Sequence, residues 1–106
     1  MPLVEWRAAV VESLAPLGVE RVYLFGSHAR GTATKRSDLD LLVLWETALP
    51  PLDRIGQVLW ALRELPWVVE PVVLTPAEFE ERRNLPFLRG VLREAQLLYE
   101  RGKTAA

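Results

Sequence analysis

Hydrophobic residues in the first part of the chain recur at spacings of three and four positions. The positions that follow this spacing are Leu3, Trp6, Val10 and Leu14. This spacing places them on one face of an amphipathic helix. Pro16 and Gly18 follow as helix stop signals. The pattern therefore predicts a first helix over residues 3–15.

Three short segments rich in β-branched and aromatic residues predict strands. They cover residues 22–25, 38–45 and 67–74. The middle segment is mainly leucine, with Val43 and Trp45 as its β-branched and aromatic members. The third segment contains Pro71, which has no backbone N–H to donate to a neighbouring strand. Because proline is tolerated mainly at sheet edges, the third strand is expected at an edge or to be irregular.

Prolines and a capping box mark three further helices. Pro50-Pro51 opens a helix that Pro66 ends, and Thr75-Pro76-Ala77-Glu78 has the form of a capping box that starts a short helix to about Arg83. Pro86 opens the last predicted helix. Its apolar positions are Leu88, Val91, Leu92, Ala95, Leu98 and Tyr99. The order of elements predicts an α/β (α+β) domain with a small mixed sheet flanked by helices.

Length and composition fit one small domain. The chain has 106 residues, and half of them are hydrophobic, which is enough to form a core. We expect a single domain over residues 1–101 and a flexible tail over residues 102–106. The N-terminus lacks the basic start of a signal peptide, and no apolar run approaches the length of a membrane span. The expected location is cytoplasmic.

Charge and residue counts exclude several classes of function. The formal net charge is -1, which disfavours a nucleic-acid partner. The chain has no cysteine and one histidine, His28. Disulfide scaffolds, thiolate zinc sites and multi-histidine metal sites within one chain are therefore excluded.

The residues that follow the first predicted strand can form an anion site. Gly26 allows a sharp turn and a close approach of a ligand. If residues 27–31 begin a helical turn, their free amides point outward, and Ser27 adds a hydroxyl. Arg30 adds a positive charge. This segment is a candidate cradle for a triphosphate.

Three carboxylates fall on the predicted strands. Asp38 and Asp40 are two residues apart, so their side chains lie on the same face of the second strand. Oxygen ligands of this kind suit Mg²⁺ or Mn²⁺. Glu70 lies among valines in the third strand, where a lone carboxylate is costly unless it is paired or liganded. Where the two strands are neighbours, Glu70 can join the aspartates at a metal site or act as a base.

Each feature by itself has a simpler explanation. Gly26-Ser27 can be a loop after a strand, Asp38 a solvated strand start and Glu70 a charge that protects a sheet edge. His28 and Arg30 can be exposed loop residues. The combination of a Gly-Ser turn, an Asp-x-Asp strand and a carboxylate in a third strand is much harder to obtain by chance.

The spacing resembles a known enzyme superfamily. Gly26-Ser27, ten residues and Asp38-Leu39-Asp40 are similar to the signature of the polymerase-β-like nucleotidyltransferases. The surrounding residues resemble the minimal nucleotidyltransferases of bacteria and archaea. The resemblance implies a nucleotidyltransferase fold, ATP or another nucleoside triphosphate as donor, and a divalent metal, Mg²⁺ or Mn²⁺. It implies that Gly26 and Ser27 bind triphosphate, that Asp38 and Asp40 bind metal, and that Glu70 is the third acid, where that family more often has Asp.

The same resemblance implies a partner and a reaction. Minimal nucleotidyltransferases commonly act as antitoxins that transfer AMP to a tyrosine of a HEPN-type toxin. Two alternatives stay open: a non-catalytic antitoxin or regulatory subunit that acts by binding, and transfer to an RNA 3′ end or a small molecule. The last predicted helix either packs on its own sheet or offers its apolar stripe to a partner. Homo- and hetero-oligomers both remain open.

Overall fold

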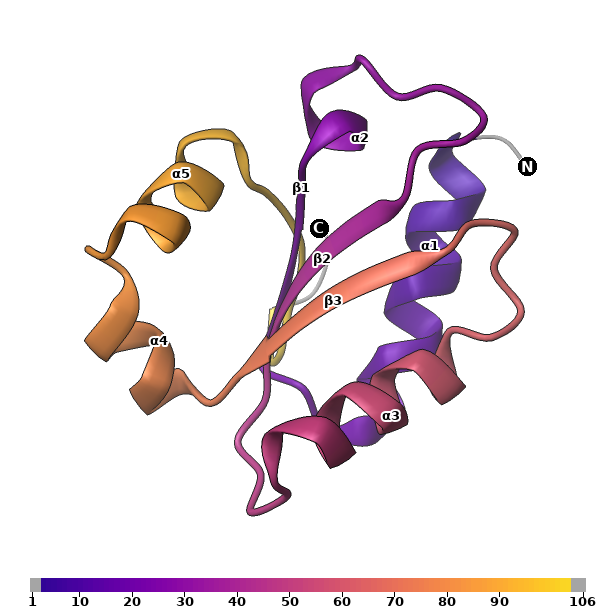
Figure 1. The fold of residues 1–106 in the computed structure, drawn as a ribbon. Helices are drawn as coiled ribbons and strands as arrows, with labels where there is room; N and C mark the ends of the chain where they lie inside the picture. Colours follow the sequence, from indigo (N-terminus) through magenta and orange to yellow (C-terminus); the bar gives the residue numbers. More distant parts are fainter. Residues whose placement is uncertain (1–2, 104–106) are drawn as a thin grey trace.

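The computed structural model describes residues 3–103, which form a four-stranded sheet between helices (Figure 1). The strands are β1 (Arg21–Phe25), β2 (Leu39–Leu44), β3 (Val69–Leu74) and β4 (Gln96–Glu100). The helical segments are α1 (Leu3–Leu14), the 3-10 turn η1 (Ala15–Leu17), α2 (Ser27–Arg30), α3 (Pro51–Ala61), α4 (Pro76–Arg82) and α5 (Pro86–Glu94). The predicted α+β class with a mixed sheet is confirmed.

The strand order is β3-β2-β1-β4. β1 runs antiparallel to both β2 and β4, whereas β2 and β3 run parallel. A parallel pair needs a crossover, and α3 supplies it between β2 and β3. The edge position predicted from Pro71 is confirmed, because β3 ends the sheet.

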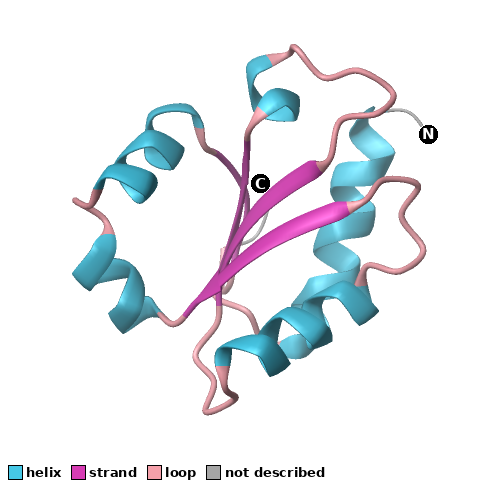
Figure 2. Cartoon of the chain, in the orientation of Figure 1, coloured by secondary structure: helices cyan, strands magenta, loops and turns pink. Residues whose placement is uncertain are grey.

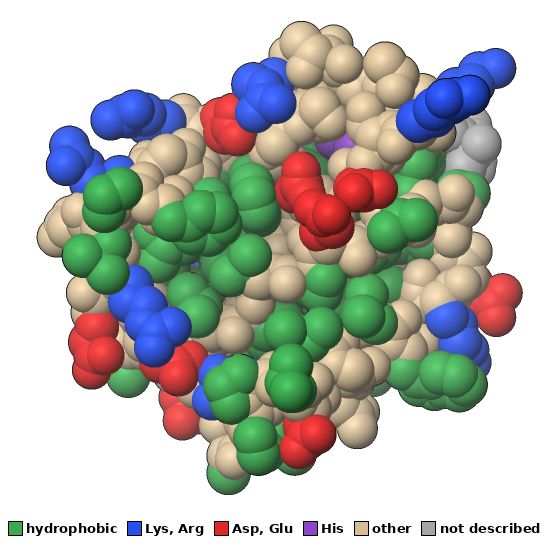
Figure 3. Space-filling view, viewed as in Figure 1, with side chains coloured by type: hydrophobic (Ala, Val, Ile, Leu, Met, Phe, Trp, Pro, Cys, Tyr) green, Lys and Arg blue, Asp and Glu red, His purple; other side chains and the backbone are tan. Residues whose placement is uncertain are grey.

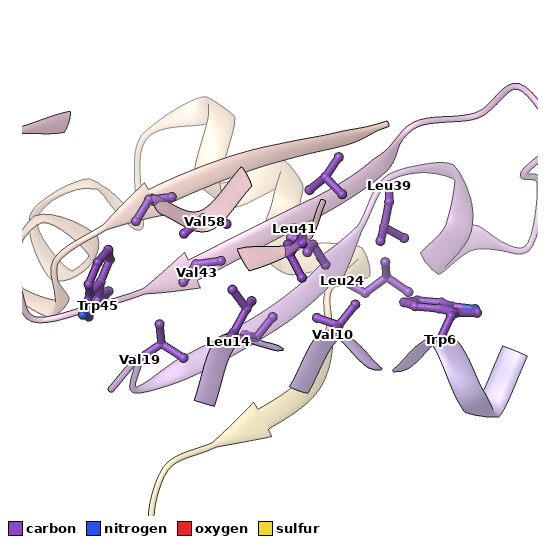
Figure 4. Close-up of a cluster of buried hydrophobic side chains, with 14 residues drawn as sticks. Trp6, Val10, Leu14, Val19, Leu24, Leu39, Leu41, Val43, Trp45 and Val58 are labelled. Carbon is purple, nitrogen blue, oxygen red and sulfur yellow. The ribbon is translucent and has the colours of Figure 1, made fainter. Parts of the chain in front are cut away.

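Helices cover both faces of the sheet, as Figure 2 shows. α1 and α3 lie on one face, and α4 and α5 lie on the other. Side chains of β2 alternate between the two layers: Leu39, Leu41 and Val43 pack with α1 and α3, whereas Leu42 and Leu44 pack with α4 and α5. Figure 4 shows the first layer, where Trp6, Val10 and Leu14 of α1 face the sheet.

The last predicted helix is wrong beyond Glu94. α5 ends there, because the backbone of Ala95 is extended (φ −62°, ψ 137°). The residues that follow form β4, which pairs with β1 at the other edge of the sheet. Hydrogen bonding to β1 thus overrides a helical spacing that continues to Tyr99. Leu88 and Val91 are buried against the sheet, which confirms that α5 packs within its own chain.

Two smaller expectations concern the ends of elements and of the chain. The third strand starts at Val69, later than predicted, and Trp67 and Val68 precede it. Residues 101 and 102 form a turn that the N–H of Lys103 closes by donating to the carbonyl of Glu100 at 3.1 Å, and residues 104–106 of the expected tail lie outside the described part. Within residues 3–103, no helix combines the length and hydrophobicity needed to cross a membrane.

Candidate active site

Strand register brings the predicted site residues to one end of the sheet. Asp40 pairs with Phe25 of β1 on one side and with Glu70 of β3 on the other. Phe25 leads directly into Gly26 and α2. Asp40 and Glu70 point to the α4/α5 face, because Leu42, two positions beyond Asp40, packs in that layer. Acidic side chains gather there below α2 (Figure 3).

Gly26 lies directly against the Asp40 carboxylate. A Cβ atom on Gly26 would lie 2.0 Å from Asp40 Oδ2 and 2.9 Å from its Cγ. The backbone of Gly26 is also in a region that other residues rarely adopt, with φ 74° and ψ −156°. Glycine at this position therefore does two things: it turns the chain from β1 into α2, and it leaves room for Asp40.

The three carboxylates interact with one another. Burial raises the pKa of Asp40, and the neighbouring charge of Asp38 raises it further. Hydrogen bonding with Asp38 and then with Asp40 raises the pKa of the exposed Glu70 carboxyl. Because the negative charges of neighbouring carboxylates repel one another, the three groups do not all ionise readily. The predicted meeting of Asp38, Asp40 and Glu70 is present in the structure.

This donor set fits a divalent cation. Within residues 3–103, no three His, Asp or Glu side chains are arranged as a ready-made metal site. The chemistry nevertheless matches, because carboxylate oxygens are the ligands of Mg²⁺ and Mn²⁺, and a cation between Asp38 and Asp40 would relieve their mutual repulsion. Glu70 is the residue that could complete such a set from β3.

Arg30 is held by a residue that the sequence analysis did not single out. Its Nη1 donates to Oε1 and Oε2 of Glu94 at 3.0 and 2.9 Å. The N–H of Gly26 donates to the same Oε1 at 3.1 Å. These contacts lower the pKa of Glu94. Arg30 thus lies at the edge of the turn, paired with a carboxylate, and its predicted role as a phosphate ligand remains a prediction.

Ser27 opens α2, as the predicted helical turn requires. The amides of Ala29 and Arg30 donate to the carbonyl of Gly26 at 3.0 and 3.1 Å. The carbonyl of Ser27 accepts from the N–H of Thr32 at 3.0 Å, so its hydroxyl is not needed to close the turn. This arrangement leaves the hydroxyl and the first amides of α2 available for a ligand.

His28 is not the exposed loop residue that its position in the sequence favours. The half-buried ring packs edge-on against Trp67, with ring centroids 5.7 Å apart, and against Trp6 at 6.2 Å. The charge of His28 lowers the pKa of Asp40, partly offsetting the effect of burial. The ring therefore anchors α2 to the α1 side of the sheet, close to the carboxylates.

Comparison with known families identifies the family of this chain. A family model described as "Nucleotidyltransferase domain" matches residues 7–99. The chain belongs to the nucleotidyltransferase domain family. The match includes the Gly-Ser turn, both aspartates and Glu70. Two relatives in Methanocaldococcus jannaschii support the same enzyme class for this nucleotidyltransferase.

The first is named "Putative protein adenylyltransferase MJ0604". It is 31% identical over 81 residues, which cover 76% of this chain and 79% of the relative. The second, "Putative protein adenylyltransferase MJ1305", is 31% identical over 87 residues, with 76% and 58% covered. This chain is therefore an enzyme of the nucleotidyltransferase class.

Solved structures agree with the fold of the nucleotidyltransferase. A structure described as a "putative minimal nucleotidyltransferase" is 41% identical, with a TM-score of 0.63 over 89% of this chain and 90% of that chain. The predicted resemblance to minimal nucleotidyltransferases is thereby confirmed. A crystal structure of a toxin-antitoxin with AMP-PNP has a TM-score of 0.67 over 89% of this chain and 73% of that chain. Its identity is 21%, so it shows the fold alone.

Proposed function

We propose that this nucleotidyltransferase transfers AMP from ATP to a hydroxyl of a partner protein and thereby acts as an antitoxin. The proposed acceptor is a tyrosine of a HEPN-type toxin. The names of the M. jannaschii relatives support a protein acceptor. The toxin-antitoxin neighbour, which was crystallised with AMP-PNP, supports ATP as the donor and a toxin as the partner.

One observation carries the proposal: the register that sets Glu70 opposite Asp40 beside the Gly26 turn. A phosphate donor needs a turn that admits its phosphates, and the transfer needs carboxylates next to that turn. Both requirements are met by residues from β1, β2 and β3. A metal-binding role would also explain why the chain keeps carboxylates whose neighbouring charges raise the pKa values of Asp40 and Glu70.

The acceptor hydroxyl attacks the α-phosphorus of ATP. A bond forms between the acceptor oxygen and the α-phosphorus, and the bond to the β-phosphate oxygen breaks, so pyrophosphate leaves. Glu70, with its raised pKa and exposed position, takes the proton of the attacking hydroxyl. The Ser27 hydroxyl and the first amides of α2 hold the β- and γ-phosphates.

Asp38 and Asp40 would hold Mg²⁺ or Mn²⁺. When bound, the metal supplies positive charge that offsets the charge developing on the phosphate oxygens. The two aspartates are suited to this role because Asp38 directly precedes β2, Asp40 lies two residues further along, and the charge of Asp38 adds to the rise in the pKa of Asp40.

The test is a transfer assay with α-labelled ATP and Mg²⁺. The protein is incubated with and without the protein encoded by the neighbouring gene. We expect label on that partner, and we expect Asp38→Asn and Asp40→Asn to abolish it while both variants remain folded. Glu80→Gln, which changes an exposed carboxylate on α4, is the matched control and should transfer normally.

The other outcomes separate the alternatives. Normal transfer by both aspartate variants would exclude the proposed role of these residues. A partner that is bound and inhibited without label would identify a binding antitoxin. Label on added RNA or on a small hydroxylated molecule, with none on protein, would identify that molecule as the acceptor in place of a partner protein.

A further inference from the structure

The junction between α5 and β4 lies against the turn that would bind the phosphates. Glu94 is the last residue of α5, and Gln96 is the first residue of β4. The two residues flank Ala95, where the chain changes from helix to strand. Their side chains contact residues about seventy positions earlier in the chain, in and around α2.

Glu94 contacts both ends of α2. Its Oε1 accepts from the N–H of Gly26, which precedes the helix, at 3.1 Å. Both carboxylate oxygens accept from the guanidinium of Arg30, the last residue of the helix, at 3.0 and 2.9 Å. Hydrogen bonds between charged groups are stronger than neutral ones. A single carboxylate thus spans the whole turn.

Gln96 makes a further contact with α2. Its Nε2 donates to the carbonyl of Ala29 at 2.9 Å. Its Oε1 accepts from Nη2 of Arg7, in α1, at 2.8 Å. The side chain of Gln96 therefore links α2 to α1, and its amide cannot rotate without losing both bonds.

α2 needs such external support. It has only four residues, and a helix of that length does not form by itself in water. Adjacent to it, Gly26 has a backbone conformation that is costly for the chain unless its surroundings fix it. The contacts of Glu94 act on both features, because they bond the N–H of Gly26 and the side chain of Arg30.

We propose that Glu94 is a positioning residue, which holds the segment from Gly26 to Arg30 in the shape that binds the triphosphate of a nucleotide. This inference rests on the proposed function of the same site. Glu94 does not touch the reacting atoms; it acts through Gly26 and Arg30. The Arg30 guanidinium contributes to the shape of this segment through its hydrogen bonds with Glu94.

Nucleotide affinity tests this role. The probe is α,β-methylene-ATP with Mg²⁺, because it cannot be cleaved at the reacting bond, and its Kd for the full chain is measured by calorimetry. We expect Glu94→Ala to weaken binding about tenfold. Glu94→Gln should weaken it about threefold at most, since its amide oxygen still accepts from the Gly26 N–H.

The matched control is Glu80→Gln, which removes an exposed contact between a carboxylate on α4 and Arg83, the residue after that helix, and should leave the Kd unchanged. The melting temperature of each variant is measured alongside. A merely structural role would lower the melting temperature of Glu94→Ala and leave the Kd of the folded protein unchanged, and this result would overturn the inference. Tighter binding by Glu94→Ala would also overturn it, because Glu94 would then compete with the phosphates.

Two further measurements keep the test decisive. If Glu94→Ala does not fold, Glu94→Asp takes its place, because its carboxylate is one methylene short of the turn; full affinity in that variant would overturn the inference. If the unaltered protein fails to bind the probe, the proposed function fails. The inference about Glu94 then fails with it, whereas equal Kd values for the unaltered protein and Glu94→Ala would overturn the inference alone.

Discussion

Gly26 and Asp40 share a space that only a residue without a side chain leaves open. The 2.0 Å approach of a Cβ on Gly26 to Asp40 Oδ2 is far shorter than any real contact of this kind. Asp40 would have to move, and its position beside Asp38 and Glu70 would be lost. The glycine of the Gly-Ser turn thus sets the geometry of the carboxylates as well as the path of the chain.

Gly26→Ala should therefore abolish transfer, and Gly31→Ala should not. Both glycines have positive φ, 74° and 76°, so both variants pay a conformational cost. Gly31 is in the left-handed helical region, where that cost is about 1 kcal/mol, whereas the ψ of −156° at Gly26 belongs to a region nearly restricted to glycine, where it is about 1–3 kcal/mol. Only Gly26→Ala also meets a neighbouring atom, since a Cβ on Gly31 has nothing within 4 Å. The measurement is transfer of label in parallel with urea unfolding. Equal activity of the two variants would show that the contact with Asp40 is unimportant.

Asp40→Asn should stabilise the metal-free protein at neutral pH. The pKa of Asp40 is raised above its ordinary value, so its charged form is disfavoured in the folded state. A group of this kind favours folding at pH values below its unfolded pKa and loses that contribution as the pH rises through its folded pKa.

We expect the urea midpoint of Asp40→Asn in EDTA to exceed that of the unaltered protein at pH 7. The difference should narrow as the pH falls through the raised pKa of Asp40, because the carboxyl then takes up a proton and no longer carries the disfavoured charge. A difference that widens toward acid pH would contradict this explanation.

The carboxylates could be predicted from the sequence, and Glu94 could not. Asp38 and Asp40 are two residues apart on a strand, and Glu70 is a single charge among valines, so local pattern alone marks them. Glu94 lies within the helical spacing of the last helix and resembles any solvated helical glutamate. Its contact with Gly26 depends on where α5 ends, and no local signal specifies that point.

At the scale of elements, β4 is the strand that the sequence pattern did not predict. Its residues continue the three- and four-residue spacing of α5, and neither glycine nor proline separates the two. The free edge of β1 decides the outcome, because its backbone N–H and C=O groups need partners. By contrast, the capping box at Thr75 and Glu78 was predicted correctly, because all of its contacts are local.

Glu78 connects this capping box to α3. Its Oε1 accepts from the N–H of Thr75 at 2.8 Å and from Nη1 of Arg54 at 2.7 Å. Arg54 is 7% exposed and also donates to the carbonyl of Leu49. Removing the charge of Glu78 would leave a buried guanidinium without its counterion, which is costly.

Glu78→Gln should destabilise the fold by about 2 kcal/mol at pH 7. The bond from the Thr75 amide, and then the contact with Arg54, lower the pKa of Glu78. A lowered pKa gives stability above the ordinary carboxyl value of about 4 that is lost as the pH falls through the folded pKa. Urea unfolding at several pH values measures this, and the deficit of the variant should shrink in acid. Glu80→Gln, at an exposed position, serves as control.

At the scale of the whole molecule, β2 joins two hydrophobic layers. Leu41 is buried with α1 and α3, and Leu42 is buried with α4 and α5; both are 0% exposed. The sequence predicts that helices flank the sheet, but the alternation of side chains along a strand does not specify which helix covers which face. The pairing of strands and the path of the crossover decide that.

Leu41→Ala and Leu42→Ala should each cost about 3 kcal/mol. Because the two residues are neighbours on one strand, we expect both variants to unfold in a single cooperative transition. Fluorescence and circular dichroism should give the same urea midpoint for each variant. Two separate transitions in either variant would show that the layers fold independently.

The α5–β4 junction has a consequence for the making of the protein. A ribosome delivers the Gly-Ser turn and both aspartates early, the third carboxylate thirty residues after Asp40, and Glu94 only near the end. Until the α5–β4 junction is in place, the N–H of Gly26 and the side chain of Arg30 lack the Glu94 carboxylate that bonds them both in the folded protein. An unfinished or clipped chain can thus carry every carboxylate of the site and still lack the support for its phosphate turn. Synthesis of the last strand would then be the moment at which the enzyme becomes competent.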